Sequence, residues 1–190
     1  MRIIFCGVGA LGSTAVLFCR NLEAQMVFID DDRVESKNLL AQVFVKQSLG
    51  KNKAQSMRLQ LQNFFGISSE AFAVRVTKQN VDTLIENSEL IVDCFDNAAS
   101  RLLLSEAVKN TPKALLHAGI SADGCFGIVR WEEKFVADEE DQPGQATCEG
   151  GEHLPLIGLV GSTIARTVQD YITTKAQHNY IVTLNGVQQH

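Results

Sequence analysis

Several features that would place a chain in other protein classes are scarce or missing in this sequence. No apolar run approaches the roughly 20 residues that a membrane-spanning helix needs, so we expect no membrane partner. Lys and Arg (17) are fewer than Asp and Glu (22), and they form no cluster. Because nucleic-acid phosphates are bound by clustered cations, we expect no nucleic-acid partner. The opening residues, Met1 to Cys6, lack a signal-peptide pattern, which favours a cytoplasmic protein.

The five cysteines are odd in number and scattered along the sequence. They form no C-x-x-C pair, so neither zinc nor a disulfide framework is expected. Cys6, Cys94 and Cys125 lie in apolar strand-like runs and Cys19 lies on an apolar helix face, so we expect these four to be core residues. Cys148 differs, because its polar, glycine-rich surroundings offer a thiol no core to fill.

Short apolar runs alternate with amphipathic segments along the whole sequence. The 190 residues fit one domain, 1–190, which is long enough to bury a sizeable core. Asp123-Gly124 indicates a hairpin, so the late strands should be antiparallel. We therefore expect an α/β fold: a Rossmann-like mixed sheet, parallel in its N-terminal part and antiparallel in its late strands, with helices on both faces.

The expected strands cover 3–6, 26–29, 71–76, 90–96, 114–119, 125–131 and 180–184. Helices are expected from the end of the glycine motif to about residue 23, and over 51–65, 80–86, 97–109 and 155–176. The stretch 132–152 is rich in Glu, Asp, Gln and Gly. We expect it to be a mobile crossover loop near the active site.

A glycine fingerprint of the form G-x-G-x-x-G, made by Gly7, Gly9 and Gly12, lies between the first strand and the first helix. The first glycine permits a tight turn, the second lets a phosphate approach the backbone, and the third lets helix and strand pack closely. The N-terminus of the helix then offers unpaired N–H groups to an anion. Alone this motif is weak, but in this context it indicates a nucleotide site.

An acidic motif follows the next apolar run. Asp30 comes 18 residues after Gly12, near the spacing of about 20 at which an acid binds the ribose of a nucleotide. At the carboxyl end of a buried strand, Asp30, Asp32 and Asn38 should line one crevice. For this stretch alone, a solvated acidic loop that caps the next helix is an equally good interpretation.

Two more charged residues occupy informative places. Lys53 lies in the first turn of the helix expected over 51–65, where a cation opposes the helix dipole at a cost of up to about 1 kcal/mol. A lysine at this place is either solvated or needed for an anion. Asp96 ends the apolar run 90–96, where it either faces a ligand or caps the next helix. We expect both side chains to face solvent at the edge of a site.

Together these motifs resemble those of the ThiF/MoeB/HesA family of ubiquitin-like-protein activating enzymes. The family pattern is a glycine fingerprint, then D-x-D-x-V-x-x-S-N-L-x-R-Q, then G-x-x-K-A, then a strand ending in D-N with an arginine after it. The matching residues are Gly7, Gly9, Gly12, Asp30, Asp32, Val34, Asn38, Leu39, Gln42, Gly50, Lys53, Ala54, Asp96, Asn97 and Arg101. A further likeness is Cys148 followed by Leu154 to Gly161.

The resemblance implies an enzyme that uses ATP and Mg²⁺ to adenylate the C-terminal glycine of a small β-grasp protein, either ubiquitin-like or a sulfur carrier. It implies that Asp30 binds ribose, Asn38 helps to position the nucleotide, Lys53 offsets phosphate charge and Asp96 holds Mg²⁺. The nucleotide site would comprise Gly7, Gly9, Gly12, Asp30, Asp32, Asn38, Gln42, Lys53 and Asp96. Cys148, between glycines and just before a helix, is the candidate thiol that takes the activated group.

Two departures from the family pattern leave a second hypothesis open. Ala41 stands where the family has an arginine that can bind phosphate through two hydrogen bonds. The sequence also begins at the first strand, without the N-terminal helix that in relatives supplies an arginine to the partner's site. The alternative is therefore a catalytically weak, nucleotide-binding scaffold subunit of a heterodimeric activating enzyme. Lys53 and Asp96 favour an active enzyme, because a scaffold needs neither.

Other classes explain the residues less well. An NAD-dependent dehydrogenase would share the fingerprint and Asp30, but it leaves Lys53 and Asp96 without a role. A dehydratase acting on modified adenosine in tRNA is disfavoured by the acidic balance. His117 is expected to be a strand-end polar residue. We expect a homodimer or heterodimer, because the resemblance implies a symmetric interface and the first strand would otherwise leave an uncovered edge.

Overall fold

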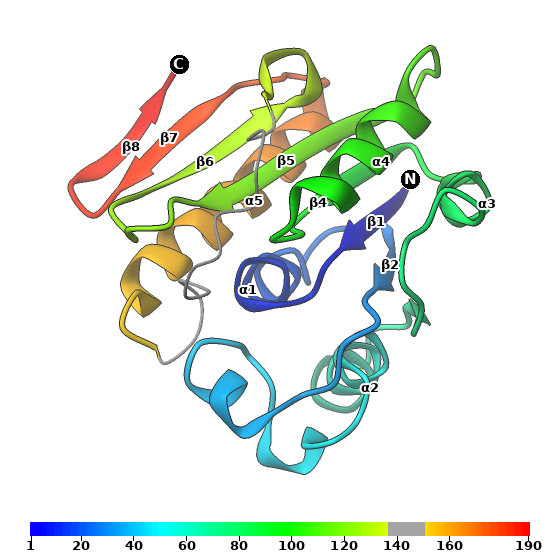
Figure 1. Cartoon of the computed structure of the whole chain (residues 1–190), viewed down its shortest axis with the longest axis vertical. Helices are drawn as coiled ribbons and strands as arrows, with labels where there is room; N and C mark the ends of the chain where they lie inside the picture. Colours follow the sequence, from blue (N-terminus) through cyan, green and yellow to red (C-terminus); the bar gives the residue numbers. More distant parts are fainter. Residues whose placement is uncertain (137–150) are drawn as a thin grey trace.

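The computed structural model describes residues 1–136 and 151–190, which form an eight-stranded mixed sheet with helices around it (Figure 1). The elements, in chain order, are β1 (Arg2–Cys6), α1 (Ala10–Phe18), β2 (Gln25–Ile29), the short 3-10 helices η1 (Ser36–Leu40) and η2 (Lys46–Ser48), α2 (Lys53–Phe65), β3 (Glu70–Phe72), α3 (Val81–Ile85), β4 (Leu90–Asp93), α4 (Ala98–Val108), β5 (Ala114–Ile120), β6 (Phe126–Trp131), the 3-10 turn η3 (Glu132–Lys134), α5 (Leu154–Thr174), β7 (Tyr180–Thr183) and β8 (Gly186–Gln189).

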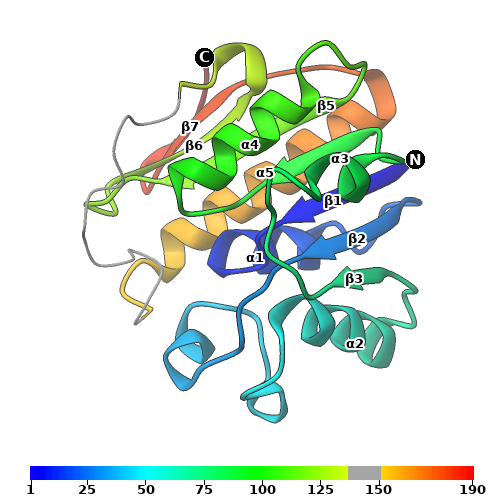
Figure 2. The ribbon, with the colours of Figure 1, turned by 45° about the vertical axis from the view of Figure 1, so that its right-hand side comes forward.

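The strand order of the sheet is β3-β2-β1-β4-β5-β6-β7-β8. The pairs from β3 to β5 are parallel, and the pairs from β5 to β8 are antiparallel, so the predicted fold class is confirmed. Figure 2 shows β1, β2 and β3 side by side, with α2 next to β3. The expectation that the first strand leaves an open edge is wrong, because β1 lies inside the sheet between β2 and β4.

The alternation of side chains along β1 explains how one sheet builds two cores. Ile3 and Phe5 pack with the helices α1, α2 and α5, whereas Ile4 and Cys6 pack with α3 and α4. All four side chains are fully buried, as expected for a parallel strand covered on both faces. In Figure 1, α4 accordingly lies in front of β4 and β5, and α5 lies behind them.

Several element boundaries differ from those expected, and most differences have a physical cause. The third strand ends at Phe72 rather than at Val76, because it pairs only with the last residues of β2, Val27 to Ile29. The strand β4 ends at Asp93, whose carboxylate accepts a hydrogen bond from the backbone N–H of Phe95 and so starts a turn. The helix α1 ends at Phe18, earlier than expected, for which we have no physical account.

The last strand, β8, was not predicted. Its residues, Gly186–Gln189, are all exposed and carry only one apolar side chain with no alternation, so the sequence gives no sign of burial. Part of the expected crossover loop 132–152 is also structured, since η3 continues directly from β6. Residues 137–150 lie outside the described ranges. Within those ranges, no helix is long and apolar enough to cross a bilayer.

The parallel half of the sheet determines where the candidate residues meet. The strands β1, β2, β4 and β5 all point the same way, so the segments that follow them emerge at one edge. In open α/β sheets this carboxyl edge is where ligands bind. The glycine fingerprint follows β1 and the acidic motif follows β2, while Asp96 follows β4. Three of the four sequence motifs thus come together by topology, and the fourth joins them through α2.

Candidate functional site at the carboxyl edge of the sheet

The three fingerprint glycines have different structural roles. Gly7 has a positive φ of 81°, and a Cβ atom there would lie 2.9 Å from the carbonyl oxygen of Cys94. A Cβ atom on Gly12 would lie only 1.9 Å from the carbonyl oxygen of Gly7. Gly9, the residue that precedes α1, would meet no described atom within 4 Å. Gly7 and Gly12 are therefore required by the fold, whereas Gly9 leaves open space at the N-terminus of a helix.

Substitutions in this loop should separate folding from binding. Gly12→Ala is expected to lower the free energy of unfolding by about 1–3 kcal/mol, because backbone must shift to admit the methyl group. Gly9→Ala should unfold at nearly the wild-type urea concentration but bind nucleotide more weakly. Urea unfolding and calorimetric titration would measure the two effects. Equal losses of stability in both variants would contradict this division.

Asp30, which follows β2 directly, is hydrogen-bonded to the glycine fingerprint. One carboxylate oxygen accepts a hydrogen bond from the backbone N–H of Val8 at 2.8 Å, and the other accepts one from the N–H of Asp32 at 2.9 Å. Burial raises the pKa of the Asp30 carboxyl to about 6, and the ammonium group of Lys53 offsets only part of that rise. The carboxyl is thus ionised at pH 7 and has remaining lone pairs for a hydroxyl ligand.

The raised pKa predicts a pH dependence of binding. If ionised Asp30 accepts hydrogen bonds from ribose, affinity should fall about tenfold between pH 7 and pH 5, as the carboxyl protonates through a pKa near 6. Adenosine is a suitable probe because it has no phosphate that titrates in this window. The folding stability of the free protein should depend on pH in the opposite direction. A raised carboxyl pKa contributes to the free energy of unfolding below about pH 4, and this contribution is lost as the pH rises through 6. Asp30→Asn should abolish the pH dependence, and an unchanged dependence would exclude Asp30 as its source.

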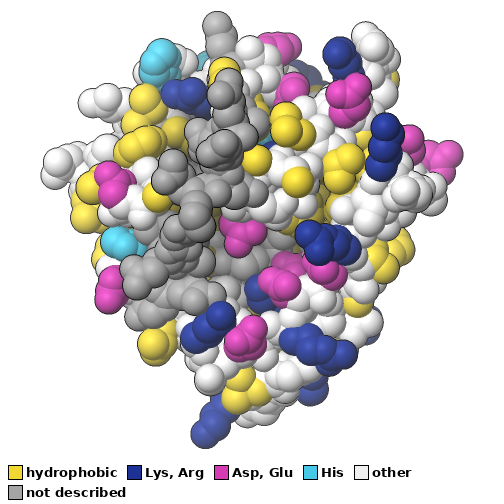
Figure 3. Space-filling view, in the orientation of Figure 1, with side chains coloured by type: hydrophobic (Ala, Val, Ile, Leu, Met, Phe, Trp, Pro, Cys, Tyr) yellow, Lys and Arg dark blue, Asp and Glu magenta, His cyan; other side chains and the backbone are white. Residues whose placement is uncertain are grey.

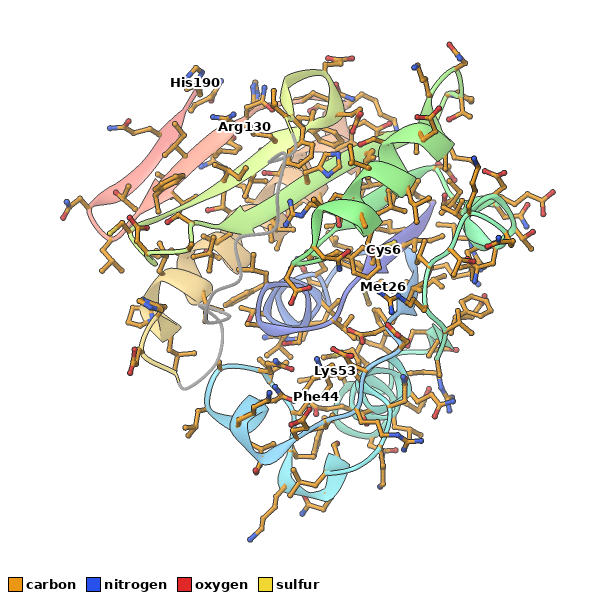
Figure 4. The ribbon with its side chains drawn as sticks, in the orientation of Figure 1. Cys6, Met26, Phe44, Lys53, Arg130 and His190 are labelled. Carbon is orange, nitrogen blue, oxygen red and sulfur yellow. The ribbon has the colours of Figure 1, made fainter. Side chains whose placement is uncertain are left out.

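Lys53 is a buried cation at this edge. Its side chain lies between α2 and the loop that follows β2 (Figure 4), and its Nζ is 2.8 Å from the Oδ2 atom of Asp32. The expectation that Lys53 faces solvent is wrong, since it is only 7% exposed. Asp32 is exposed, so its carboxylate can move away while the lysine stays in place. An incoming phosphate could then replace the carboxylate as the partner of the ammonium group.

Asn52, which the sequence analysis missed, holds the acidic motif in place. Its Nδ2 donates to the carbonyl oxygens of Asp30 at 2.7 Å and Asp32 at 3.1 Å. Its Oδ1 accepts from the N–H of Gln55 and so caps α2. An asparagine directly before a helix is an N-cap signal that could have identified it. The expected helix began at residue 51, which placed Asn52 inside it.

Asn38 and Gln42 lie on the segment that connects the acidic motif to α2. Asn38 is buried, and its Oδ1 accepts the backbone N–H of Glu35 in a capping box, so this oxygen serves the local fold. Gln42 is also buried, and its Oε1 has no hydrogen-bond partner among the described atoms. The next residue, Val43, donates its N–H to the hydroxyl of Ser13 in α1. This segment is therefore attached to the fingerprint helix.

The candidate metal ligand Asp96 is exposed, in the turn between β4 and α4. Asp93, at the end of β4, is fully buried instead and contacts His117. His117 lies in the middle of β5 and is fully buried, so the expectation of a strand-end residue is wrong. The described acidic oxygens that come close enough to share a cation belong to Asp30, Asp31 and Asp32.

Of the four cysteines expected in the core, two are fully buried, one is half-buried and one is exposed. Cys6 and Cys19 are buried as expected, and Cys94 is half-buried. Cys125 is exposed, because the hairpin turn extends one residue further than expected and β6 begins at Phe126. Cys148 lies outside the described residues, so its proposed role stays a prediction.

Of two hollows in the described surface, only one lies near the carboxyl edge of the sheet. One of about 430 Å³ lies beside the acidic motif and is lined by Asp31, Arg33, Lys51 and Asn52, among others. A larger one, about 580 Å³, lies near Arg2 and contains none of the candidate groups. Neither hollow is lined by Asp30, Lys53 or the fingerprint glycines, so we place the candidate site by the convergence of these groups and not by a hollow. Acidic and basic side chains are interleaved on the lower half of the face in Figure 3.

Comparison with known proteins shows where similar sequences occur. An adenylyltransferase and sulfurtransferase UBA4 from Debaryomyces hansenii is 26% identical over 203 aligned residues, which cover 99% of this chain and 45% of that protein. A SAMP-activating enzyme E1 from Haloferax volcanii is 31% identical over 122 residues, covering 63% of this chain and 45% of that enzyme. The chain thus spans about half the length of these relatives.

Solved structures show the same fold. The crystal structure of E. coli MccB with MccA-N7isoASN matches with a TM-score of 0.79 at 16% identity, covering 100% of this chain and 63% of that one. A family model described as the ThiF family matches residues 1–190. The chain therefore belongs to the ThiF family.

Proposed function

We propose that this chain binds ATP with Mg²⁺ and adenylates the C-terminal glycine of a small protein, either ubiquitin-like or a sulfur carrier. The observation that carries the proposal is the convergence at one edge of the sheet. There, buried Lys53 lies against the acidic motif, and Asp30 joins that motif to the glycine loop. The names of the relatives, an adenylyltransferase and sulfurtransferase and a SAMP-activating E1, support the same reaction class.

The described residues suit the binding steps of this reaction. The open backbone at Gly9 leaves room for phosphate at the start of α1. Asp30 would accept hydrogen bonds from ribose, and Lys53 would exchange Asp32 for a phosphate oxygen. Asp96 offers an exposed carboxylate, the kind of hard oxygen ligand that Mg²⁺ prefers. The ion, when bound, would offset negative charge on the phosphates.

In the proposed reaction a carboxylate oxygen of the terminal glycine bonds to the α-phosphorus of ATP. The bond from that phosphorus to the bridging oxygen breaks, and pyrophosphate leaves with the electron pair. Anion approaches anion in this step, so the catalytic contribution of the protein is positioning and fixed positive charge. Lys53 supplies that charge from a buried site, where screening by water is weak.

The scaffold hypothesis remains because of Ala41. Its side chain is buried as part of the core that contains residues of α1, α2 and α5, so an arginine would not fit there without rearrangement. A scaffold subunit would bind nucleotide without turning it over. The capacity to exchange pyrophosphate into ATP would therefore distinguish the two hypotheses.

Calorimetric titration with ATP and with NAD tests the nucleotide. Mg²⁺-dependent binding of ATP is expected together with weak binding of NAD, because Lys53 and Asp96 serve phosphates and a metal that have no place in hydride transfer. Removal of Mg²⁺ with EDTA is the matched control. Tight NAD binding with no Mg²⁺-dependent ATP binding would exclude adenylation.

Two properties of the assembled enzyme are also proposals. One is a homodimer or heterodimer, which light scattering would reveal and a strict monomer at high concentration would contradict.

The other is transfer of the activated group to Cys148. Wild-type protein should then form a thiol-sensitive adduct with its partner, and Cys148→Ser should lose the adduct while adenylation survives.

A further inference from the structure

A chain of buried and half-buried polar groups lies beside the proposed site, outside the motifs that identified it. His117 in β5 is fully buried, with its Nδ1 2.6 Å from Oδ2 of Asp93 and its Nε2 2.5 Å from Oε2 of Glu132. Glu132 also accepts a hydrogen bond from the hydroxyl of Ser105 at 2.9 Å. The ring of Phe135 stacks on the imidazole with centroids 3.8 Å apart. Both nitrogens and one face of the imidazole are thus engaged.

The hydrogen-bond count shows that this arrangement is specific. Ionised carboxylates can only accept hydrogen bonds, and a neutral imidazole donates only one. A neutral His117 between two ionised carboxylates carries one proton and can therefore make only one of the two hydrogen bonds. If both contacts are hydrogen bonds, His117, Asp93 and Glu132 together hold a second proton. The Nη1 atom of Arg101 lies 3.9 Å from Oδ2 of Asp93 and adds positive charge. Such a group is more than apolar filling, because each member fixes the orientation of the next.

The inner end of this chain holds the turn that carries Asp96. The Oδ1 atom of Asp93 accepts the backbone N–H of Phe95 at 3.0 Å. Nη2 of Arg101 donates to the carbonyl oxygen of Phe95 and, at 2.8 Å, to that of Ala118 in β5. Both backbone polar groups of Phe95 are therefore held by side chains, and Asp96 is the next residue.

The same turn touches the glycine fingerprint. The N–H of Cys94 donates to the carbonyl oxygen of Cys6 at 2.8 Å, and the carbonyl of Cys94 occupies the space that a Cβ atom on Gly7 would need. A displacement of residues 94–96 would therefore move both Asp96 and the wall of the phosphate loop. Asp96 itself is exposed, and among the described residues no side chain is hydrogen-bonded to its carboxylate. Its position therefore depends on the backbone of the turn.

We propose that His117 is a positioning residue: it orients Asp93, and through Asp93 it fixes the turn at Phe95 and the carboxylate of Asp96. The proposal rests on the proposed function only where it assigns a metal-binding role to Asp96. The arrangement itself, from His117 to the backbone of Phe95, stands on the geometry. Residues that orient a metal ligand typically change metal affinity by about 10- to 100-fold when replaced.

Two amide substitutions separate the inner contact of the ring from the outer one. His117→Asn places an amide nitrogen close to the position of Nδ1 and can keep the hydrogen bond to Asp93. His117→Gln places it closer to the position of Nε2 and keeps the bond to Glu132 instead. If His117 only fills space, both variants should behave alike, because both lose ring packing against Phe135.

The first readout needs no nucleotide. Amide hydrogen exchange of Phe95 in the free protein should be about tenfold faster in His117→Gln and nearly unchanged in His117→Asn. Exchange at Ile4, which is fully buried in the middle of β1, is the reference for global opening. Equal exchange at Phe95 in both variants would overturn the positioning role, whether or not ATP is the substrate.

The second readout is the Mg²⁺ concentration needed for half-maximal ATP binding, measured by calorimetry. It should rise about tenfold in His117→Gln and stay within about twofold in His117→Asn. Faster exchange without this rise would overturn the link to Asp96 and leave the rest of the proposed function intact. If His117→Gln does not fold, Asp93→Asn, which weakens the inner contact, should give a change in the same direction, whereas Glu132→Ala frees only the outer nitrogen and, like His117→Asn, should give almost none. Equal results in these two variants would contradict the proposal.

Discussion

Lys53→Ala is expected to slow the exchange of pyrophosphate into ATP by about a hundredfold or more, while the free energy of unfolding changes little. The size follows from the loss of one fixed positive charge at a phosphate in the transition state, which typically costs several kcal/mol. Burial makes the loss larger, because a buried ammonium acts with little screening. The fold should tolerate the change, since Asp32, the partner left behind, is exposed and can be solvated.

Lys51→Ala is the matched control for this prediction. Lys51 lies two positions earlier at the same edge, but it is exposed, so its removal should alter exchange less than about threefold. Lys53→Arg is informative in addition, because it keeps the charge but changes its shape. Near-normal exchange in Lys53→Ala, or equal losses at both lysines, would assign Lys53 to a structural ion pair.

Asp96→Ala should have a similarly large effect, through the metal. Removing the exposed carboxylate should lower the exchange rate about a hundredfold at ordinary Mg²⁺ concentrations, and excess Mg²⁺ should recover part of the loss. The backbone of the turn should persist, because Asp93 and Arg101 hold Phe95 without help from Asp96. Exchange assays across a range of Mg²⁺ concentrations would measure both the loss and the recovery.

Asp31→Ala tests the competing location of the ion. Asp30, Asp31 and Asp32 bring their carboxylate oxygens within 4.8 Å of one another, so this cluster could also attract a cation. If Asp96 is the ligand, Asp31→Ala should leave the Mg²⁺ requirement nearly unchanged. A large Mg²⁺ defect in Asp31→Ala with a normal Asp96→Ala would move the metal to the acidic motif.

The parts of the fold predicted from sequence are those in which local pattern and burial agree. The apolar runs at 3–6 and 26–29 became β1 and β2, because strands covered on both faces need such runs. Asp123-Gly124 correctly indicated the change from parallel to antiparallel pairing. The strand β8 escaped prediction because its side chains are exposed, and pairing of backbone groups leaves no apolar signature.

The sequence predicted the residues that face the candidate site, but not the contacts that hold them in position. Spacing alone placed Asp30 next to the fingerprint, and the structure joins them through Val8. The contact between Asp93 and His117 could not be predicted, because it depends on β4 and β5 being neighbours in register. A polar residue inside an apolar run shows that a partner is needed, but not which one.

Pyrophosphate exchange into ATP, measured with a small protein that ends in Gly-Gly and with the same protein lacking both of these glycines, tests the central claim most directly. We predict Mg²⁺-dependent exchange with the intact partner, loss of exchange with the truncated one, and about a hundredfold slower exchange in Lys53→Ala. Binding of Mg²⁺ and ATP without any exchange in the presence of a protein that the chain binds would contradict an adenylating enzyme and support a scaffold subunit.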